Sequence, residues 1–272
     1  MGDAFPKKSL VWSGAILGGI VNATVTARTP SFAYAQHWTG NDYGLNGGDG
    51  REGFIGFGAG PISGEGKLVG VFFSAHSPRS IFRSGGKDDL EDVFRGCPDF
   101  QLGLAEKLIH PALEFPFQGK DVSCVTAAFW DEHEYLTAAD TWDVVLANGA
   151  DLIENELIED RKVALTAWQK DYGMSAEQVA FAQSVFERKI ARPAARIELN
   201  RSEVEWLEST FEDPRQKYLE VGEAMLKSKG DKEAIDLKWL DSLDPATEFR
   251  NAMKLCREKF AAIGILVPES KF

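Results

Sequence analysis

The sequence predicts an α+β protein in which a glycine-rich, mostly antiparallel β region, residues 1–135, packs against an acidic helical region, residues 136–272. Residues 1–100 hold 19 of the 26 glycines, set between short runs of β-branched and aromatic residues, which is the pattern of strands joined by tight turns. The rest of the chain has amphipathic stretches that begin and end with helix-capping residues. A length of 272 residues also allows the two regions to form one continuous domain.

Strands are expected in the front region wherever an apolar run lies between clusters of Gly, Asn, Asp and Pro. Residues 68–73 are apolar except for Gly70, which is typical of a central strand buried on both faces. Residues 46–50 (Asn-Gly-Gly-Asp-Gly) predict a turn, because glycine adopts positive φ without steric cost. Residues 14–20 could form a short buried helix instead of a strand, because hydrophobic periodicity does not distinguish a short buried helix from a buried strand. The expected strands are 9–12, 23–27, 31–38, 53–58 and 67–74.

The back region is expected to be mainly helical. A long helix over residues 151–172 should end at Gly173, which suits a left-handed cap. Ser175 and Gln178 form a capping box for the next helix, which Pro193 stops. A second capping box and two prolines at first helical positions predict further helix starts at Ser202, Pro214 and Pro245.

Negative charge is concentrated in the back region. The net charge is −12, and residues 101–272 carry 32 acidic against 21 basic residues, which accounts for −11 of it. Such a chain is repelled by the phosphate backbone, so we expect no nucleic-acid partner. Complementary charge favours a protein partner with a basic surface.

Two segments are candidates for contacting that partner. The first is a loop expected over residues 37–44, where aromatic rings and polar groups suited to specific contacts come together. The second is the acidic start of the helix expected at 151, whose carboxylates should spread over the outer surface. The candidate binding residues are Trp38, Asp42, Tyr43, Glu154, Glu156, Glu159 and Asp160.

These features favour a non-catalytic, acidic protein-binding protein, of the immunity-protein or antitoxin type that inhibits a basic bacterial toxin. The alternative is a hydrolase-type enzyme with a pocket near His37 and His76, which both lie near the ends of expected strands. Ser74 precedes His76, but the chain has no G-x-S-x-G motif. The glycines of residues 56–60 lack the spacing of a dinucleotide fingerprint, so no cofactor is expected.

A divalent metal site at Asp131 and His133 is a weaker alternative. Residues 131–134 (Asp-Glu-His-Glu) are the densest group of metal-ligand side chains in the sequence. Alternate residues of a strand face opposite ways, so the four cannot all converge if the strand continues, and a solvated strand end is favoured.

A cytoplasmic location and no membrane partner are expected. The three cysteines are widely spaced and odd in number, which fits a reducing compartment. The alternative is export with an N-terminal signal peptide, because Lys7 and Lys8 precede an apolar stretch that small residues follow. Cleavage would then fall after Ala27 or Ala35.

Overall fold

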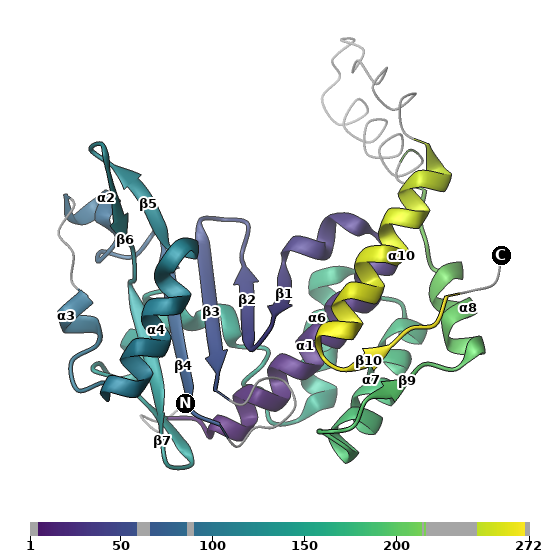
Figure 1. Cartoon of the computed structure of the whole chain (residues 1–272), viewed down its shortest axis with the longest axis horizontal. Coiled ribbons are helices and arrows are strands. Elements are labelled where there is room, and N and C mark those ends of the chain that lie inside the picture. The colour runs from purple at the N-terminus through teal and green to yellow at the C-terminus, as the bar shows by residue number, and fades with distance from the viewer. Residues whose placement is uncertain (1–4, 59–65, 86–89, 214, 216–243, 270–272) are drawn as a thin grey trace, which may run out of the picture.

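The fold class is α+β, as the sequence predicts: 50% of the structure is helix and 20% is antiparallel sheet, with the sheet strands mostly in the front half. The computed structural model describes residues 5–58, 66–85, 90–213, 215 and 244–269. Its main sheet has six strands in the order β1-β2-β3-β4-β7-β8, each antiparallel to its neighbours, with helices on both faces (Figure 1).

The strands of this sheet are β1 (Gln36–Thr39), β2 (Asp42–Asn46), β3 (Arg51–Phe57), β4 (Leu68–Ser74), β7 (Ala127–Glu132) and β8 (Tyr135–Thr137). The described residues also form two small strand pairs: antiparallel β5 (Glu114–Phe117) with β6 (Lys120–Ser123), and parallel β9 (Ile197–Glu198) with β10 (Ile265–Leu266). The helices of the front region are α1 (Lys8–Arg28), η1 (Pro30–Tyr34), α2 (Ile81–Ser84), α3 (Leu90–Val93) and α4 (Asp99–Ala112). Those of the back region are α5 (Trp142–Ala147), η3 (Ala150–Ile153), α6 (Arg161–Tyr172), α7 (Ala176–Ala191), α8 (Arg201–Ser209) and α10 (Pro245–Ala262).

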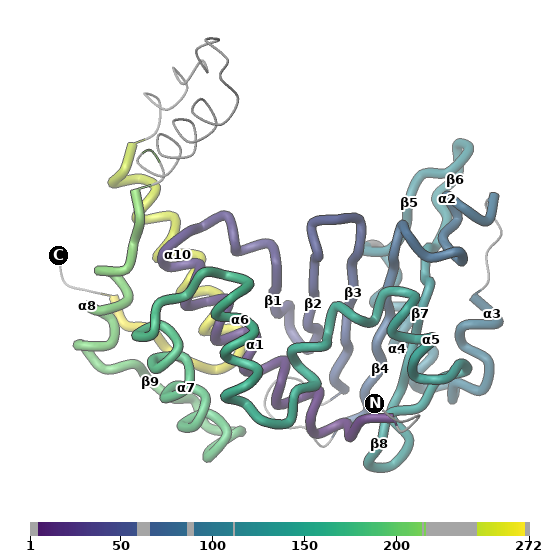
Figure 2. The backbone as a smooth tube through the Cα atoms, turned by 180° about the vertical axis from the view of Figure 1, so that it is seen from behind, coloured from purple at the N-terminus to yellow at the C-terminus, as the bar shows by residue number. Residues whose placement is uncertain are grey.

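Helix α1 is the centre of the molecule. It lies beside α10 and also contacts α7, α8, η1 and the edge strand β1 (Figures 1 and 2). Sixteen of its 21 residues are buried, so it is apolar on all sides, as a helix within a core must be. The strands expected at 9–12 and 23–27 are therefore wrong, because an all-round apolar helix has no period by which to distinguish it from strands. It ends at Arg28, and the capping residue Thr29 has an extended backbone (φ −138°, ψ 99°), the conformation that a following proline favours.

Helix α1 is also the segment that the sequence analysis considers as a possible signal peptide. It is long and apolar enough to cross a membrane, yet 89% of its most apolar window is buried inside the protein. Cleavage after Ala27 or Ala35 would remove this core helix.

The sheet separates two hydrophobic cores. Side chains alternate along each strand, so Tyr43, Ile55 and Phe72 face α1, while Phe54 and Val71 face α4. All seven residues of β4 are buried, which confirms a central strand covered on both faces. The turn predicted at residues 46–50 is confirmed as the connection between β2 and β3. The core around α1 also includes residues of α6, α7, α8 and α10, so it draws on both halves of the chain.

The helix signals of the back region are largely confirmed. Gly173 caps α6 in the left-handed conformation (φ 58°), and both hydrogen bonds of the Ser175–Gln178 capping box are present. Helix α10 begins at Pro245. The helix expected from Pro214 lies outside the described residues.

Two helix starts differ from the prediction. The second capping box is made by Asn200 with Glu203, because the Asn200 side chain accepts from the Glu203 N–H, and Ser202 lies inside the helix. The long helix expected over residues 151–172 is wrong: η3 and a turn come first, and α6 begins at Arg161 after Asp160 caps it.

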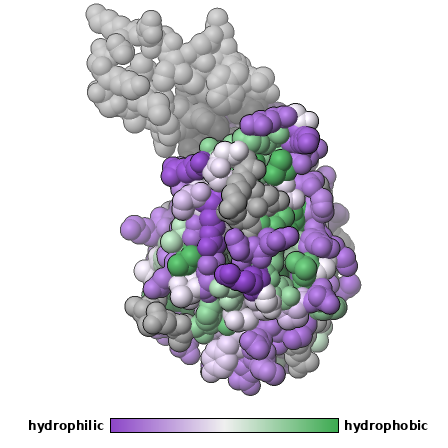
Figure 3. Space-filling view, turned by 90° about the vertical axis from the view of Figure 1, so that its left-hand side faces the viewer, coloured by the Kyte–Doolittle hydropathy of each residue, from purple (hydrophilic) through white to green (hydrophobic). Residues whose placement is uncertain are grey.

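At one edge of the hydrophobic core on the α4 side, apolar side chains are exposed to solvent. Phe82 of α2 is 53% exposed and contacts Phe115 and Phe117 of the β5–β6 hairpin edge-on. Figure 3 looks onto this side of the molecule, where apolar side chains are interspersed with hydrophilic ones. Exposed apolar residues of this kind are common on soluble proteins and need no partner.

Candidate functional site

A cavity of about 610 Å³ lies on the α1 side of the sheet edge. It is open to solvent on one side and is lined by η1, the start of the β2–β3 connection, the turn after η3 and the end of α6. We call it the Glu156 cavity. Its lining residues are mostly polar or aromatic, and those that carry the argument below are Phe32, Tyr34, Gln36, Arg51, Glu156, Trp168, Asp171 and Tyr172.

Glu156 is a fully buried carboxyl group in the wall of this cavity, 1% exposed. The Tyr43 hydroxyl donates to its Oε1 at 2.7 Å, and Gln36 Nε2 lies 3.4 Å from the same atom. Arg161 donates from Nη1 to the Glu156 backbone carbonyl at 3.0 Å. The position of this carboxyl is therefore fixed from the sheet and from α6.

Two glycines of α1 allow Glu156 to approach so closely. Gly14 and Gly18 are one turn apart and therefore on the same face of the helix. A Cβ on Gly14 would lie 2.1 Å from the Glu156 backbone oxygen, and one on Gly18 would lie 3.2 Å from its Oε1 and 2.4 Å from the Tyr43 hydroxyl. Any larger residue at either position would displace the turn or the ring.

Burial governs the acid–base behaviour of this group. Loss of solvation raises the pKa of Glu156 to about 7, although the hydrogen bond from Tyr43, its own backbone N–H and the charge of Arg161 act to lower it. The pKa of the Tyr43 hydroxyl is raised well above its usual value, mainly by burial and secondly by the neighbouring Glu156. Tyr43 therefore stays a neutral donor while Glu156 changes its charge near neutral pH.

Four aromatic rings line the same cavity: Phe32 and Tyr34 from η1, and Trp168 and Tyr172 from α6. Phe32 and Tyr172 form an edge-on pair with ring centroids 5.2 Å apart. Tyr34 is 78% exposed, so its ring lies at the solvent side of the cavity.

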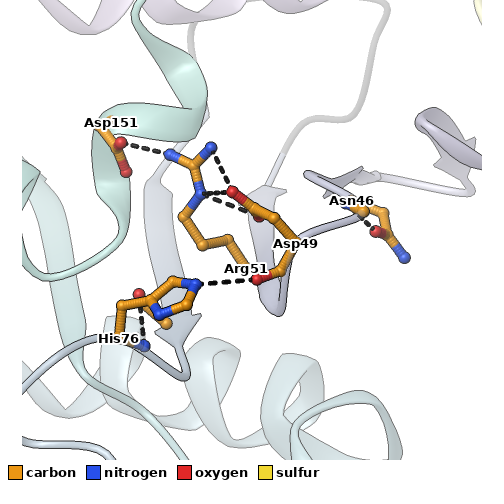
Figure 4. A network of polar contacts seen from close by, with 7 residues as sticks. Asn46, Asp49, Arg51, His76 and Asp151 are labelled. Atoms are coloured by element: carbon orange, nitrogen blue, oxygen red, sulfur yellow. Dashed lines mark hydrogen bonds and ion pairs between the residues drawn. The ribbon is translucent and has the colours of Figure 1, made fainter. Parts of the chain in front are cut away.

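A polar network holds the β2–β3 connection beside the cavity (Figure 4). Arg51 forms salt bridges with Asp49 and with Asp151 of η3. His76 Nε2 lies 3.1 Å from the Asp49 carbonyl oxygen, and the Asn46 side chain accepts from the Gly48 N–H at 2.8 Å. The hydrogen bond and charge of Arg51 lower the pKa of Asp49.

A second pocket, of about 440 Å³, contains His37 and shares Tyr34, Leu45 and Asn46 with the Glu156 cavity. We call it the His37 pocket. Besides Tyr34, its ionisable lining residues are His37, Glu52, Glu258 and Lys259.

Three groups of the His37 pocket have shifted pKa values, and burial raises that of Glu52. Lys259 Nζ donates to the Gln36 carbonyl at 2.6 Å, and burial lowers its pKa to about 8. Burial, and then the charge of Lys259, lowers the pKa of His37. The His37 ring covers Gly44, where a Cβ would lie 2.2 Å from it, and meets Phe54 edge-on at 6.0 Å.

The second histidine of the enzyme alternative lies elsewhere. His76 is outside the lining of the His37 pocket and belongs to the network of Arg51. The Ser74 hydroxyl accepts from the His76 backbone N–H, and the Ser77 hydroxyl donates to Asn148 at 2.5 Å. The described lining of the His37 pocket therefore does not include His76.

The candidate binding residues of the front region are not in a loop. Residues 37–44 belong to the β1–β2 hairpin, and Trp38 and Tyr43 are in the core, with ring centroids 5.2 Å apart. Asp42 is half-buried, and burial raises its pKa. The expected loop is wrong because strand alternation turns Trp38 and Tyr43 together toward α1. Tyr43 contributes to the site through its hydroxyl alone.

The acidic segment is split between surface and interior. Glu154, Glu159 and Asp160 are exposed as expected. The expectation that Glu156 lies on the outer surface is wrong, since the chain forms a turn here instead of a helix and directs this residue toward Gly14 and Gly18.

The two residues of the metal alternative differ in environment. Asp131 is buried, accepts from the Leu68 N–H at 2.6 Å and lies within 3.5 and 3.7 Å of the ammonium groups of Lys8 and Lys67. His133 is exposed, with φ 60°. The described residues contain no group of three or more His, Cys, Asp or Glu side chains placed to hold a metal ion.

Several residues of the two cavities were missed by sequence reasoning. Gln36, Arg51, Asp171 and Lys259 come from four separate elements, and no short motif links them. A sequence signal for the close approach of Glu156 was the pair Gly14 and Gly18. Two small residues one turn apart on a helix allow another backbone to approach it closely.

Comparison of the chain with protein-family models, with curated proteins and with solved structures found no match, so the residues of these two cavities are the basis for inferring its function.

Proposed function

We propose that the protein is a non-catalytic binding protein for a basic protein partner, acting as an inhibitor of the immunity-protein or antitoxin type. One observation carries this proposal: exposed carboxylates stand next to a preformed cavity that is itself acidic and aromatic. Glu154 follows η3 directly, and Glu159 and Asp160 end the same connection to α6, whose Asn155 and Glu156 line the cavity.

The exposed acids of this connection can meet a partner, although Asp160 also caps α6 by accepting from the Lys162 N–H. In the described ranges, none of the three carboxylates is in a salt bridge, whereas Asp140, Glu203 and Glu208 are neutralised by arginines. Complementary charge of this kind speeds encounter and selects the partner. The proposal includes a cytoplasmic location and needs no cofactor, nucleic acid or membrane.

The test uses a variant in which Glu154 and Glu159 become Gln and Asp160 becomes Asn, since Asn keeps the cap of α6. A matched control neutralises three exposed acids elsewhere, Asp121, Asp143 and Glu187. The partner is captured from native lysate on the immobilised wild-type chain and identified by mass and sequence. We expect a stoichiometric partner of high pI whose association rate falls about tenfold at low salt in the first variant, and much less in the control.

Two results would contradict the proposal. One is the recovery of no stoichiometric partner across several salt and protein concentrations. The other is an acidic partner whose association rate responds equally to both sets of neutralised acids.

A hydrolase-type enzyme remains a second candidate because of the His37 pocket. An imidazole and an amine with lowered pKa values lie in one pocket with two carboxyl groups, and such groups serve as general bases or nucleophiles. In this second candidate, Lys259 takes the place of His76 as the catalytic partner of His37.

The second candidate predicts a clear pattern among three variants. His37→Gln and Lys259→Met should each lower turnover about a hundredfold or more, as loss of a general base or nucleophile does. His76→Gln is the control and should leave turnover unchanged, because His76 is outside the pocket. A wild-type protein inactive toward esters, phosphates and glycosides, with and without divalent metal, would remove this candidate.

A further inference from the structure

The Glu156 cavity has an excess of negative charge. Among the described residues that line it, Arg51 is the only basic one, and its guanidinium is held by Asp49 and Asp151. Glu156 and Asp171 also line the cavity. The described basic residue of the lining is therefore already paired with two carboxylates outside the lining, which leaves the Glu156 and Asp171 carboxyl groups of the cavity for a further cation.

An unused acceptor lies in the same wall. Gln36 is 6% exposed and lines the cavity, and its Oε1 has no hydrogen-bond partner in the described part of the chain. Its Nε2 is directed to Glu156 at 3.4 Å. An N–H donor that reached Glu156 from the cavity would find the Gln36 side chain adjacent, and rotation of the amide by 180° would present its oxygen to that donor.

The aromatic rings select the kind of cation. Phe32, Tyr34, Trp168 and Tyr172 line the cavity with the acids. Aromatic faces attract cations, and a planar guanidinium also stacks on them while its fork of N–H groups pairs with a carboxylate. A strongly hydrated ammonium group has neither the planar face nor the fork. At about 610 Å³ the cavity is within the usual size range of small-ligand sites and has room for a whole arginine side chain.

We propose that the Glu156 cavity binds a guanidinium group, presented by an arginine side chain of the basic partner. The carboxylates of Glu156 and Asp171 pair with the guanidinium, and the aromatic rings of η1 and α6 contact its faces and its methylene stem. The identity of the donor rests on the proposed function, whereas the preference for guanidinium rests on the cavity alone.

Binding is expected to release a proton. The ionisable or charged groups that face Glu156 are Tyr43 from β2 and Arg161 and Tyr172 from α6, and Asp171 and Arg51 share the cavity with it. The two tyrosines stay neutral because burial raises their pKa values, so Glu156 is the group that titrates near neutral pH. A bound guanidinium favours the carboxylate form.

The test titrates the full chain with N-acetyl-L-arginine N-methylamide by calorimetry, and with the citrulline analogue, which has the same shape without the charge. We expect the arginine compound to bind at least about tenfold more tightly, since one lost charge-assisted pair is of that order. Its affinity should rise roughly tenfold from pH 6 to pH 8, because Glu156 with a pKa of about 7 goes from one-tenth to nine-tenths ionised. The heat should depend on the ionisation enthalpy of the buffer, which reports the released proton.

Two variants locate the binding. Glu156→Gln keeps the shape of the side chain and should weaken the arginine compound at least about tenfold and remove the pH dependence. Glu187→Gln removes the same charge from an exposed residue of α7 outside the cavity and should change the affinity less than about twofold. Equal affinity for the arginine and citrulline compounds, or equal effects of the two variants, would overturn the inference.

The same variants separate this inference from the proposed function. If the arginine compound binds and Glu156→Gln abolishes its binding while no basic partner exists, the inference stands and the proposed function fails. If a basic partner binds Glu156→Gln as tightly as the wild type, the proposed function stands and the inference fails.

Discussion

Replacing Gly14 by alanine is expected to destabilise the protein by about 2 kcal/mol and to lower its melting temperature by roughly 4–8 °C. The new Cβ would lie 2.1 to 2.6 Å from the oxygen, carbonyl carbon and Cα of Glu156, all of them backbone atoms that cannot rotate away. Overpacking a core costs about 1–3 kcal/mol, and here the upper end applies. Alanine regains about 1 kcal/mol through its higher helix propensity, which is too little to offset the clash.

Gly103→Ala is the matched control for this prediction. Gly103 is in the middle of α4, and a Cβ there would meet nothing within 4 Å among the described residues. The same substitution should therefore stabilise the chain by up to about 1 kcal/mol. Urea unfolding of the three proteins measures both effects, and a Gly14→Ala variant as stable as Gly103→Ala would contradict the close packing of Glu156 on α1.

Replacing Glu156 by glutamine is expected to stabilise the protein increasingly as the pH rises. The pKa of Glu156 is raised from 4.5 to about 7 by burial, so the folded state holds this proton more tightly than the unfolded state. Its contribution to stability is therefore complete below pH 4.5, decreases as the pH rises toward 7, and is lower by about 3 kcal/mol above it. Glutamine stays neutral and can still accept the Tyr43 hydroxyl, so the variant avoids this loss.

The measurement is the free energy of unfolding of both proteins from pH 5.5 to pH 8.5, a range above the sequence pI of about 4.9. The stability of Glu156→Gln relative to wild type should rise by about 2 kcal/mol across this range. A constant difference between Glu156→Gln and wild type would show that Glu156 is already charged in the folded protein at pH 5.5.

Parts of the fold that depend on local signals were predictable from the sequence. The Ser175 capping box, the cap at Gly173, the start of α10 at Pro245 and the buried strand β4 are each determined by neighbouring residues. Helix α1 was not predictable in this way. Its residues are apolar on every side, and only the packing of the sheet and three helices around it distinguishes a core helix from strands.

The candidate site was less predictable than the fold. Glu156 was identified as a binding residue from charge, but its burial depends on contacts with Gly14, Gly18, Gln36 and Tyr43, which are more than 100 positions away in the sequence. An acidic run looks alike whether its members face water or the interior. The identification of this carboxyl as the ionisable group of a cavity required the three-dimensional arrangement.

The most direct test of the account is a ¹³C NMR titration of the Glu156 side-chain carboxyl, assigned by its loss in Glu156→Gln. The account predicts a titration midpoint near 7 in the free protein. Saturating N-acetyl-L-arginine N-methylamide should lower that midpoint by about one unit or more, and the citrulline analogue should leave it in place. A midpoint near 4.5 in the free protein, the value of an ordinary glutamate, or a midpoint that neither compound moves, would contradict the account.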